Sequence, residues 1–191
     1  MDTDTRHALI ENATRLVRQR GYSAFSYADL AEVVGIRKPS IHHHFPNKEG
    51  LGVVIVAAYT DRFAELLDRI DRSSVDAIGR IVAYAAPYRA GIDSGQGCLC
   101  GVLAAEMNVL PERVQDEVRQ FFTCNLRWLE KVLIQGLAGG EFRRDVQPQR
   151  EARTILATLQ GAMSLALSLQ DARVFEDALE GMIAGLRATV N

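Results

Sequence analysis

Residues 21–51 decide the fold, and they read GYSAFSYADLAEVVGIRKPSIHHHFPNKEGL. Ser26 is a residue type that caps helix N-termini, and Asp29 follows it three positions later, as in a variant of the capping box. The apolar residues that come next recur with helical spacing. We therefore predict a short helix over residues 27–33.

A second short helix is expected after a turn. Gly35 supplies the backbone freedom that a tight turn needs. Pro39 lies in the first turn of the next helix, where its missing N–H has no partner to lose. Ile41 and Phe45 are four residues apart, so they share one helix face and are expected to point into the core. We predict this helix over residues 38–44.

The opposite face of this second helix is polar and cationic. It presents Arg37, Lys38, Ser40, His42, His43 and, in part, His44. A helix that is apolar on one side and carries cations and donors on the other can enter the major groove of DNA, where it reads base edges and binds phosphates. Lys48, at the start of the following helix, stands beside a positive dipole end and suits a phosphate. This pattern is typical of a helix-turn-helix unit, whose second helix reads the bases.

Residues 21–51 resemble the N-terminal DNA-binding domain of TetR-family transcriptional regulators along their whole length. The resemblance implies a homodimeric repressor whose two reading helices enter successive major grooves of a palindromic operator in double-stranded DNA. It also implies a small-molecule ligand, bound in a C-terminal core, that moves the reading helices out of register. The DNA contacts implied by position are Ser26 and Tyr27 on phosphate, Arg37, Lys38 and Ser40 at the start of the reading helix, His42 and His43 on its exposed face, and Lys48 on the backbone.

Two features refine this resemblance. His42 stands where the family most often has a tyrosine, and it remains a hydrogen-bond donor. The segment of residues 97–101, Gly-Cys-Leu-Cys-Gly, followed by Leu103 and Glu106, is similar to the Gly-Cys-x-x-Gly start of a central helix in one subgroup, the LmrA/YxaF-like regulators.

Helical periodicity continues through the rest of the chain, and no stretch alternates with the period of a strand. We expect about nine helices, over residues 4–20, 27–33, 38–44, 47–70, 74–90, 97–108, 111–138, 149–170 and 174–188. The predicted fold class is all-α. Residues 1–50 are expected to form a three-helix DNA-binding domain, and residues 51–191 a larger helical domain for ligand binding and dimerisation.

The formal net charge of −2 taken alone argues against a nucleic-acid partner, because cations dominate DNA affinity. The charge is not evenly distributed, however. Residues 1–50 have a formal charge of +1 and hold all four histidines, whereas residues 51–191 have a charge of −3. Between Arg37 and Lys48 there are three cations, three histidines and no acid. The small negative total therefore conceals a cationic reading helix.

Composition excludes several classes of protein. The chain is 48% apolar and 24% charged, which is ordinary for a globular protein. The N-terminus has no secretory h-region, and no apolar stretch is long enough to span a bilayer, so we expect no membrane association. Three cysteines make a disulfide framework improbable and favour a reducing cytoplasm. We expect no cofactor and no bound metal.

Aromatic and methionine side chains outside residues 1–50 are mostly core residues by their helical spacing. Together with a few polar groups, such side chains also form the usual apolar ligand chamber of a helical protein. We therefore predict a hydrophobic or aromatic effector. The candidate ligand-binding residues are Phe63, Tyr84, Tyr88, Met107, Phe121, Asn125, Trp128 and Met163.

Two clusters invite sharper interpretations. Cys98 and Cys100 form a Cys-x-Cys pair that could sense oxidants, although buried cysteine commonly serves as a small apolar residue and no basic side chain adjoins this pair. Residues 42–44 are three consecutive histidines, but neighbours on a helix point about 100° apart and cannot converge on one metal ion.

The last two predicted helices carry broad apolar stripes that a lone chain would leave partly uncovered, so we predict a two-fold dimer through them. Their residues are Ile155, Leu156, Leu159, Ala162, Met163, Ala166 and Leu167 on one helix, and Phe175, Leu179, Met182, Ile183 and Leu186 on the other. We find no catalytic arrangement of nucleophile, base or carboxylate pair and predict that the protein is not an enzyme. The alternatives to a repressor are a DNA-binding protein with a non-transcriptional role and a cysteine-based redox sensor.

Overall fold

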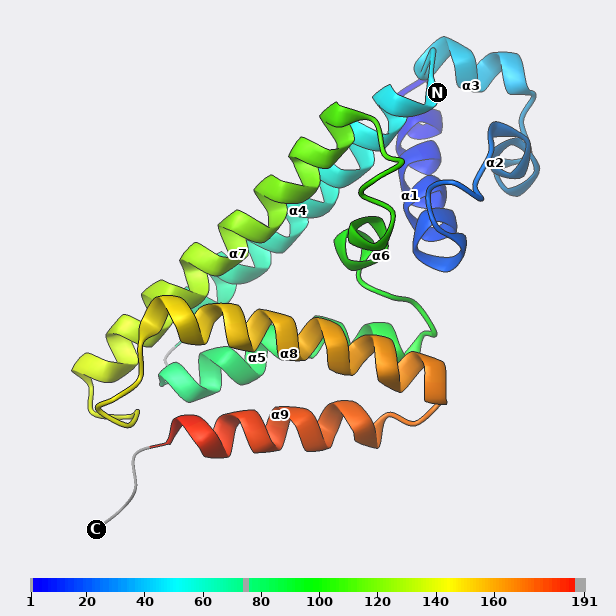
Figure 1. Ribbon diagram of the computed structural model, residues 1–191. Helices are drawn as coiled ribbons and strands as arrows, with labels where there is room; N and C mark the ends of the chain where they lie inside the picture. Colours follow the sequence, from blue (N-terminus) through cyan, green and yellow to red (C-terminus); the bar gives the residue numbers. More distant parts are fainter. Residues whose placement is uncertain (1, 74–75, 188–191) are drawn as a thin grey trace. The chain divides into compact units, whose positions relative to one another are not determined.

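The computed structural model describes residues 2–73 and 76–187, and within them the chain forms nine α-helices (Figure 1). They are α1 (Asp2–Arg20), α2 (Tyr27–Val34), α3 (Lys38–His44), α4 (Lys48–Arg72), α5 (Ala77–Asp93), α6 (Leu99–Ala105), α7 (Glu112–Ala138), α8 (Pro148–Leu169) and α9 (Arg173–Leu186). One isolated β-bridge pairs Phe142 with Arg187. The prediction of an all-α fold is confirmed. No helix among the described residues is both long enough and apolar enough to cross a membrane.

The helix bounds agree with the predicted ones to within a few residues, and the largest differences are at α5 and α6. The start of α5 is set by Asp76, whose carboxylate accepts a hydrogen bond from the Gly79 N–H at 2.7 Å. α6 ends at Ala105, earlier than predicted, because Glu106 caps it in a tight turn back to Leu103. The predicted helix residues 74, 75 and 188 lie outside the described residues.

The chain divides into two compact units. The first unit holds residues up to Arg62 together with Cys98–Phe121, and the second holds Phe63–Gly97 together with the residues from Phe122 onward. The unit that contains α1, α2 and α3 therefore also takes in α6 and the first part of α7.

In the first unit α1 packs against α2 and α6, and α2 packs against α3. The predicted apolar face of α1 is buried, and it includes Leu9, Ala13, Leu16 and Val17. Leu30 contributes the buried side chain of α2 to the same unit. α1 and α2 thus bury the faces that the spacing of their apolar residues predicts.

In the second unit α8 packs against α9 and α5, and α9 also packs against α5 (Figure 1). The apolar stripe predicted on α8 is buried in this arrangement from Ile155 to Ala166, and Phe175, Ile183 and Leu186 of α9 are buried as well. The helices of the same chain cover most of the stripe residues, but Leu167, Leu179 and Met182 are only half-buried, so the stripes are partly uncovered. The dimer through these helices stays a prediction. Different apolar residues remain in solvent, among them Leu165 and Leu169 of α8.

Candidate functional site

The start of α2 is a complete capping box. The Ser26 hydroxyl oxygen accepts hydrogen bonds from the N–H groups of Ala28 and Asp29, and the Asp29 carboxylate accepts from the Ser26 N–H at 2.9 Å. Hydrogen bonds from Ser26 hold the pKa of Asp29 below its usual range, and Arg20 contributes in the same direction. At the other end, Gly35 is left-handed with φ 74°. The predicted cap and turn are confirmed.

α3 has the predicted two-sided character. Ile41 and Phe45 are 0% and 3% exposed, so they anchor the helix in the first unit. The exposed residues of the opposite face are Arg37, Lys38, Ser40, His42 and His43, and His44 is half-buried. The helix therefore presents cations and hydrogen-bond donors to solvent on a rigid apolar base, which is what reading a DNA groove requires.

Tyr27 connects α2 to the end of α3. Its hydroxyl donates a hydrogen bond to the carbonyl oxygen of Phe45 at 2.9 Å, and its ring meets the ring of His42 edge-on at 5.0 Å. Burial, with a smaller contribution from Tyr22, raises the pKa of Tyr27 to about 12. The Nδ1 atom of His42 lies 3.2 Å from the Pro46 carbonyl oxygen. The hydroxyl proton of Tyr27 is therefore used within the protein, and its ring helps to orient His42.

Lys48 lies against the turn between α1 and α2. Its Nζ atom is 4.6 Å from the centre of the Tyr22 ring and 5.0 Å from the centre of the Phe25 ring. Burial lowers the pKa of Lys48, an effect that the charges of Glu106 and Asp29 oppose. The ammonium expected on a DNA phosphate is thus held by two aromatic faces in the free protein.

Glu106 is a residue of this unit that the sequence analysis did not single out for a role. Its carboxylate accepts hydrogen bonds from the N–H groups of Tyr22 and Ser23, each at 2.8 Å, and from the Ser23 hydroxyl. Burial acts to raise the pKa of Glu106, but the hydrogen bonds from Ser23 and Tyr22 and the charge of Lys48 together hold it below its usual range. No local pattern could have revealed this contact, because its partners are more than eighty residues apart.

Arg6 is a further cation near the reading helix. Its guanidinium carbon lies 5.3 Å from the centre of the Phe45 ring, and the side chain is exposed. A stacked, exposed guanidinium beside the end of α3 is available to an anion in solvent. The sequence signals this pair only weakly. Phe45 is an apolar residue at the C-terminal cap of α3, and Arg6 is an arginine early in the chain.

The candidate ligand residues fall in both units. Met107 and Phe121 belong to the first, where the Phe121 ring lies 5.5 Å from that of Tyr59. The other six belong to the second unit, in which Met163 is buried on α8. Sequence reasoning could not separate the two sets, because helical spacing reports burial and does not report which helices meet.

Four of the candidate ligand residues meet around a fifth, Tyr84. With Phe175 they form what we call the Tyr84 cluster, which consists of Phe63, Tyr84, Tyr88, Asn125, Trp128 and Phe175. The Tyr84 hydroxyl donates to Asn125 Oδ1 at 2.9 Å and lies 3.3 Å from the Tyr88 hydroxyl. The Tyr84 ring stacks on Trp128 at 5.4 Å and 19°, and Phe63 meets it edge-on at 5.8 Å. The Tyr88 ring in turn stacks on Phe175 at 6.5 Å. All six side chains are buried.

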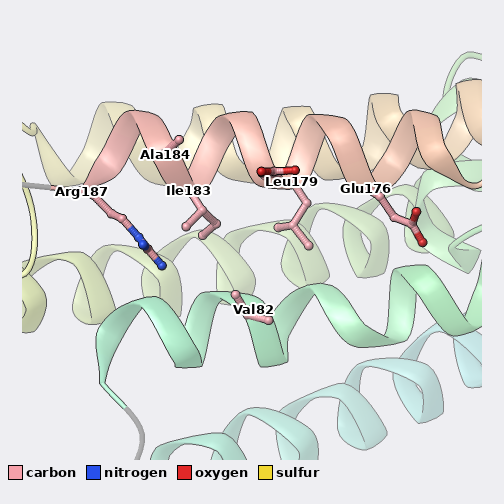
Figure 2. Close-up of a pocket in the computed structure, with 7 residues that line it drawn as sticks. Val82, Glu176, Leu179, Ile183, Ala184 and Arg187 are labelled. Atoms are coloured by element: carbon pink, nitrogen blue, oxygen red, sulfur yellow. The ribbon is translucent and has the colours of Figure 1, made fainter.

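The second unit also has a groove that no member of the Tyr84 cluster lines. It has a volume of about 390 Å³ and runs between α5 and α9 (Figure 2). Its lining combines apolar side chains with three charged ones, and none of the eight candidate ligand residues lines it. Its lining residues are Val82, Glu176, Leu179, Glu180, Ile183, Ala184 and Arg187.

The cysteines are free thiols in different surroundings. Cys98 and Cys100 are buried and Cys124 is exposed. The Tyr59 hydroxyl lies 3.7 Å from the Cys98 sulfur, and burial raises the pKa of Cys100 well above its usual value. A raised thiol pKa reduces the thiolate fraction that reacts with oxidants. Across the described residues, no three His, Cys, Asp or Glu side chains are grouped so as to hold a metal ion.

Comparisons with known proteins agree with this geometry. A family model described as "Bacterial regulatory proteins, tetR family" matches residues 9–52, and one described as "Tetracyclin repressor-like, C-terminal domain" matches residues 76–182. The repressor DhaR of Mycobacterium sp. (strain GP1) is 30% identical over 162 residues, which cover 84% of this chain and 81% of DhaR. The regulator YxaF of Bacillus subtilis is 28% identical over 173 residues, covering 88% of this chain and 87% of YxaF.

Solved structures show the same relationship in three dimensions. The crystal structure of a TetR-family regulator from Agrobacterium tumefaciens superposes with a TM-score of 0.95 at 33% identity, covering 98% of this chain and all of that one. Both the sequence matches and this structural match extend across the reading helix and the C-terminal helices. The chain belongs to the TetR family of bacterial transcriptional regulators.

Proposed function

We propose that the protein is a repressor that binds a palindromic operator as a homodimer and is released by a small hydrophobic or aromatic effector. The observation that carries this proposal is α3, whose cationic and donor face is exposed while Ile41 and Phe45 hold its other face rigidly. In this proposal residues 1–50 bind DNA, and residues 51–191 bind the effector and a second copy of the chain. The protein works without a catalytic step and in the cytoplasm, where bacterial DNA lies.

The DNA contacts in this proposal follow the exposed surface of the helix-turn-helix unit. Arg37, Lys38 and Ser40 meet base edges or phosphates at the start of α3, and His42 and His43 read bases along it. Ser26 and Tyr27 approach the phosphate backbone at the start of α2. The side chain of Lys48 is half-buried, and its ammonium lies over the rings of Tyr22 and Phe25. Lys48 reaches a phosphate if this ammonium turns away from the two rings.

The proposed dimer uses the solvent face of α8 and α9. Leu165 and Leu169 of α8 are 57% and 65% exposed and lie one helical turn apart, so they share one solvent-facing side of the helix. Gly161 of α8 and Gly181 and Gly185 of α9 have open space where a Cβ would stand. Exposed leucines beside glycines permit two helix pairs to approach closely, as a four-helix interface requires.

The deciding experiment is selection of operator sequences from random DNA with the full chain. A palindromic site, located upstream of a gene or operon whose products act on small molecules, is the expected result. Adding the substrates of those gene products should then release the operator. A non-transcriptional DNA-binding role predicts instead that no such compound changes DNA affinity.

The redox-sensing alternative makes a different prediction for the same DNA complex. The buried positions of Cys98 and Cys100 and the raised pKa of Cys100 favour a structural role. Labelling the intact protein with a thiol reagent should therefore modify Cys124 first and leave operator affinity unchanged. Loss of the operator on modification of Cys98 or Cys100 would instead support a redox sensor.

A further inference from the structure

Trp128 carries a buried hydrogen-bond donor that no described protein atom satisfies. The side chain is 8% exposed, and its Nε1 atom has less than 1 Å² of accessible area and no acceptor within hydrogen-bonding distance. Buried tryptophan N–H groups usually find an acceptor, because an unpaired one loses its bond to water without replacement. The donor therefore marks a place where an acceptor from outside the chain would gain a hydrogen bond.

We propose that the Trp128 N–H anchors an uncharged, flat effector that carries a hydrogen-bond acceptor such as a carbonyl oxygen. This inference rests on the proposed function, since it specifies the chemical class of the effector and the residue that orients it. The site is the part of the Tyr84 cluster beside the Trp128 indole.

The hydroxyls of Tyr84 and Tyr88 and the side-chain oxygen of Asn125 are engaged with one another. Asn125 Oδ1 accepts from the Tyr84 hydroxyl at 2.9 Å, and the hydroxyl oxygens of Tyr84 and Tyr88 are 3.3 Å apart. These bonds hold the three side chains in place on α5 and α7. The indole N–H of Trp128 is left as the donor that a ligand can reach without breaking an internal bond.

The cluster selects against charge. Its six members include no acid, lysine, arginine or histidine, so an ionised ligand would leave water without gaining a counter-ion. Arg89, which follows Tyr88 on α5, is already paired with Asp93 and Glu176. A carboxylate or ammonium ligand is therefore disfavoured relative to a neutral one of the same size.

Ring geometry favours a flat ligand. Tyr84 and Trp128 lie nearly parallel, at 19° and 5.4 Å, while Phe63 meets Tyr84 at 81°. A planar group that enters beside Trp128 can stack on one ring and meet another edge-on, which are the two preferred aromatic arrangements.

The test uses the indole as its own reporter, because Trp128 is the only tryptophan of the chain. A ¹⁵N–¹H spectrum of the full-length protein contains one indole resonance. Three probes of matched size are titrated: acetophenone, which has a carbonyl acceptor, cumene, which lacks one, and benzoate, which is charged. Acetophenone should shift the indole proton downfield and saturably, whereas cumene should not shift it downfield and benzoate should bind at least tenfold more weakly than acetophenone.

A Trp128→Phe variant supplies the second measurement. It keeps an aromatic ring but removes the donor. The affinity for acetophenone should therefore fall by roughly tenfold, and the affinity for cumene should change by less than about twofold. Two results would contradict the role of the Trp128 N–H as donor to the ligand. One is an indole resonance that does not shift with acetophenone, and the other is an equal loss of affinity for acetophenone and cumene in the variant. Benzoate binding as tightly as acetophenone would overturn the uncharged class. If the variant does not fold, the indole titration of the natural chain decides alone.

Operator release separates this inference from the proposed function. Anisotropy of the selected operator is measured with each probe. If acetophenone shifts the indole resonance and leaves operator affinity unchanged, the Trp128 hydrogen bond is supported, and release of the operator by this ligand is contradicted. If a different compound releases the operator without moving the indole resonance, the proposed function stands and the anchor fails.

Discussion

The Glu106 carboxylate accepts a hydrogen bond from the Tyr22 N–H at 2.8 Å, and so joins the end of α6 to the turn that leads from α1 into α2. The same carboxylate accepts from the Ser23 N–H and lies near the ammonium of Lys48. α6 is thereby connected to the helix-turn-helix unit by an ionic group as well as by apolar packing.

Replacing Glu106 with Gln should therefore destabilise the first unit in a pH-dependent way. The hydrogen bonds and Lys48 lower the pKa of Glu106 in the folded chain, so its contribution is present above its unfolded pKa and is lost as pH falls through the folded value. We expect a loss of about 1 kcal/mol at neutral pH, given the partial exposure of the group. Urea unfolding from pH 7 downward should show a difference between the two proteins that is full at pH 7 and disappears as the pH falls through the folded pKa of Glu106. Glu65→Gln, on the exposed side of α4, is the control and should show no such dependence.

Gly21 should not tolerate alanine. Its φ is +86°, and a Cβ there would overlap Glu106 Oε1. The left-handed backbone alone costs about 1–2 kcal/mol for a residue with a side chain, and displacement of Glu106 adds to this. Gly95→Ala is a matched control, because Gly95 has φ +65° and open space around its Cβ position. The free energy of unfolding should fall more for Gly21→Ala than for Gly95→Ala, and the difference measures the cost of displacing Glu106. Equal decreases in the two variants would contradict this cost.

Lys38→Ala and His43→Ala should change which operator sequences are bound. Both side chains are exposed on α3. Loss of a contact to a base edge lowers the free energy that discriminates between bases at the contacted operator position by about 1–3 kcal/mol. Repeating the selection from random DNA with each variant tests this. Uniform weakening on every sequence, without relaxed preference at any position, would mean that α3 does not read bases.

Lys48→Ala should weaken binding to all sequences equally and lower the salt slope of binding by about 1. This outcome requires the ammonium to leave the rings of Tyr22 and Phe25 for a phosphate, since in the free protein it lies over both. Affinities measured between low and moderate salt give the slope. An unchanged slope together with lower stability would show that Lys48 acts only through its aromatic contacts.

Leu165→Glu should convert the protein to a monomer. Leu165 is 57% exposed in the single chain, and a carboxylate brought into the proposed helix interface would be buried without a partner. Sedimentation at micromolar concentration should show a dimer for the natural chain and a monomer for this variant. Val82→Glu is the control, because Val82 is 45% exposed in the groove between α5 and α9. A monomeric natural chain would refute the interface.

Much of the DNA-binding unit could be predicted because its signals are local. A capping serine and its partner aspartate are three residues apart, and Ile41 and Phe45 share a face because a helix repeats every 3.6 residues. The bounds of α2 and α3, the left-handed Gly35 and the division of α3 into buried and exposed faces all follow from such short-range rules.

How far the apolar stripes of α8 and α9 are covered could not be predicted, for the complementary reason. Periodicity identifies which face of a helix is apolar but not which other helix covers it. Here α5, α8 and α9 bury Ile155, Leu159 and Phe175 within one chain and leave Leu165 and Leu169 outside.

By itself, therefore, the sequence determined the helices, the cap of α2 and the cationic face of α3, since each depends on residues within about one helical turn. Tertiary structure alone decided that Glu106 holds the turn after α1, that Lys48 rests on Tyr22 and Phe25, and that Tyr84 gathers Asn125 and Trp128. Those contacts join residues that are distant in the chain, and only the packing of whole helices brings them within hydrogen-bonding or stacking distance.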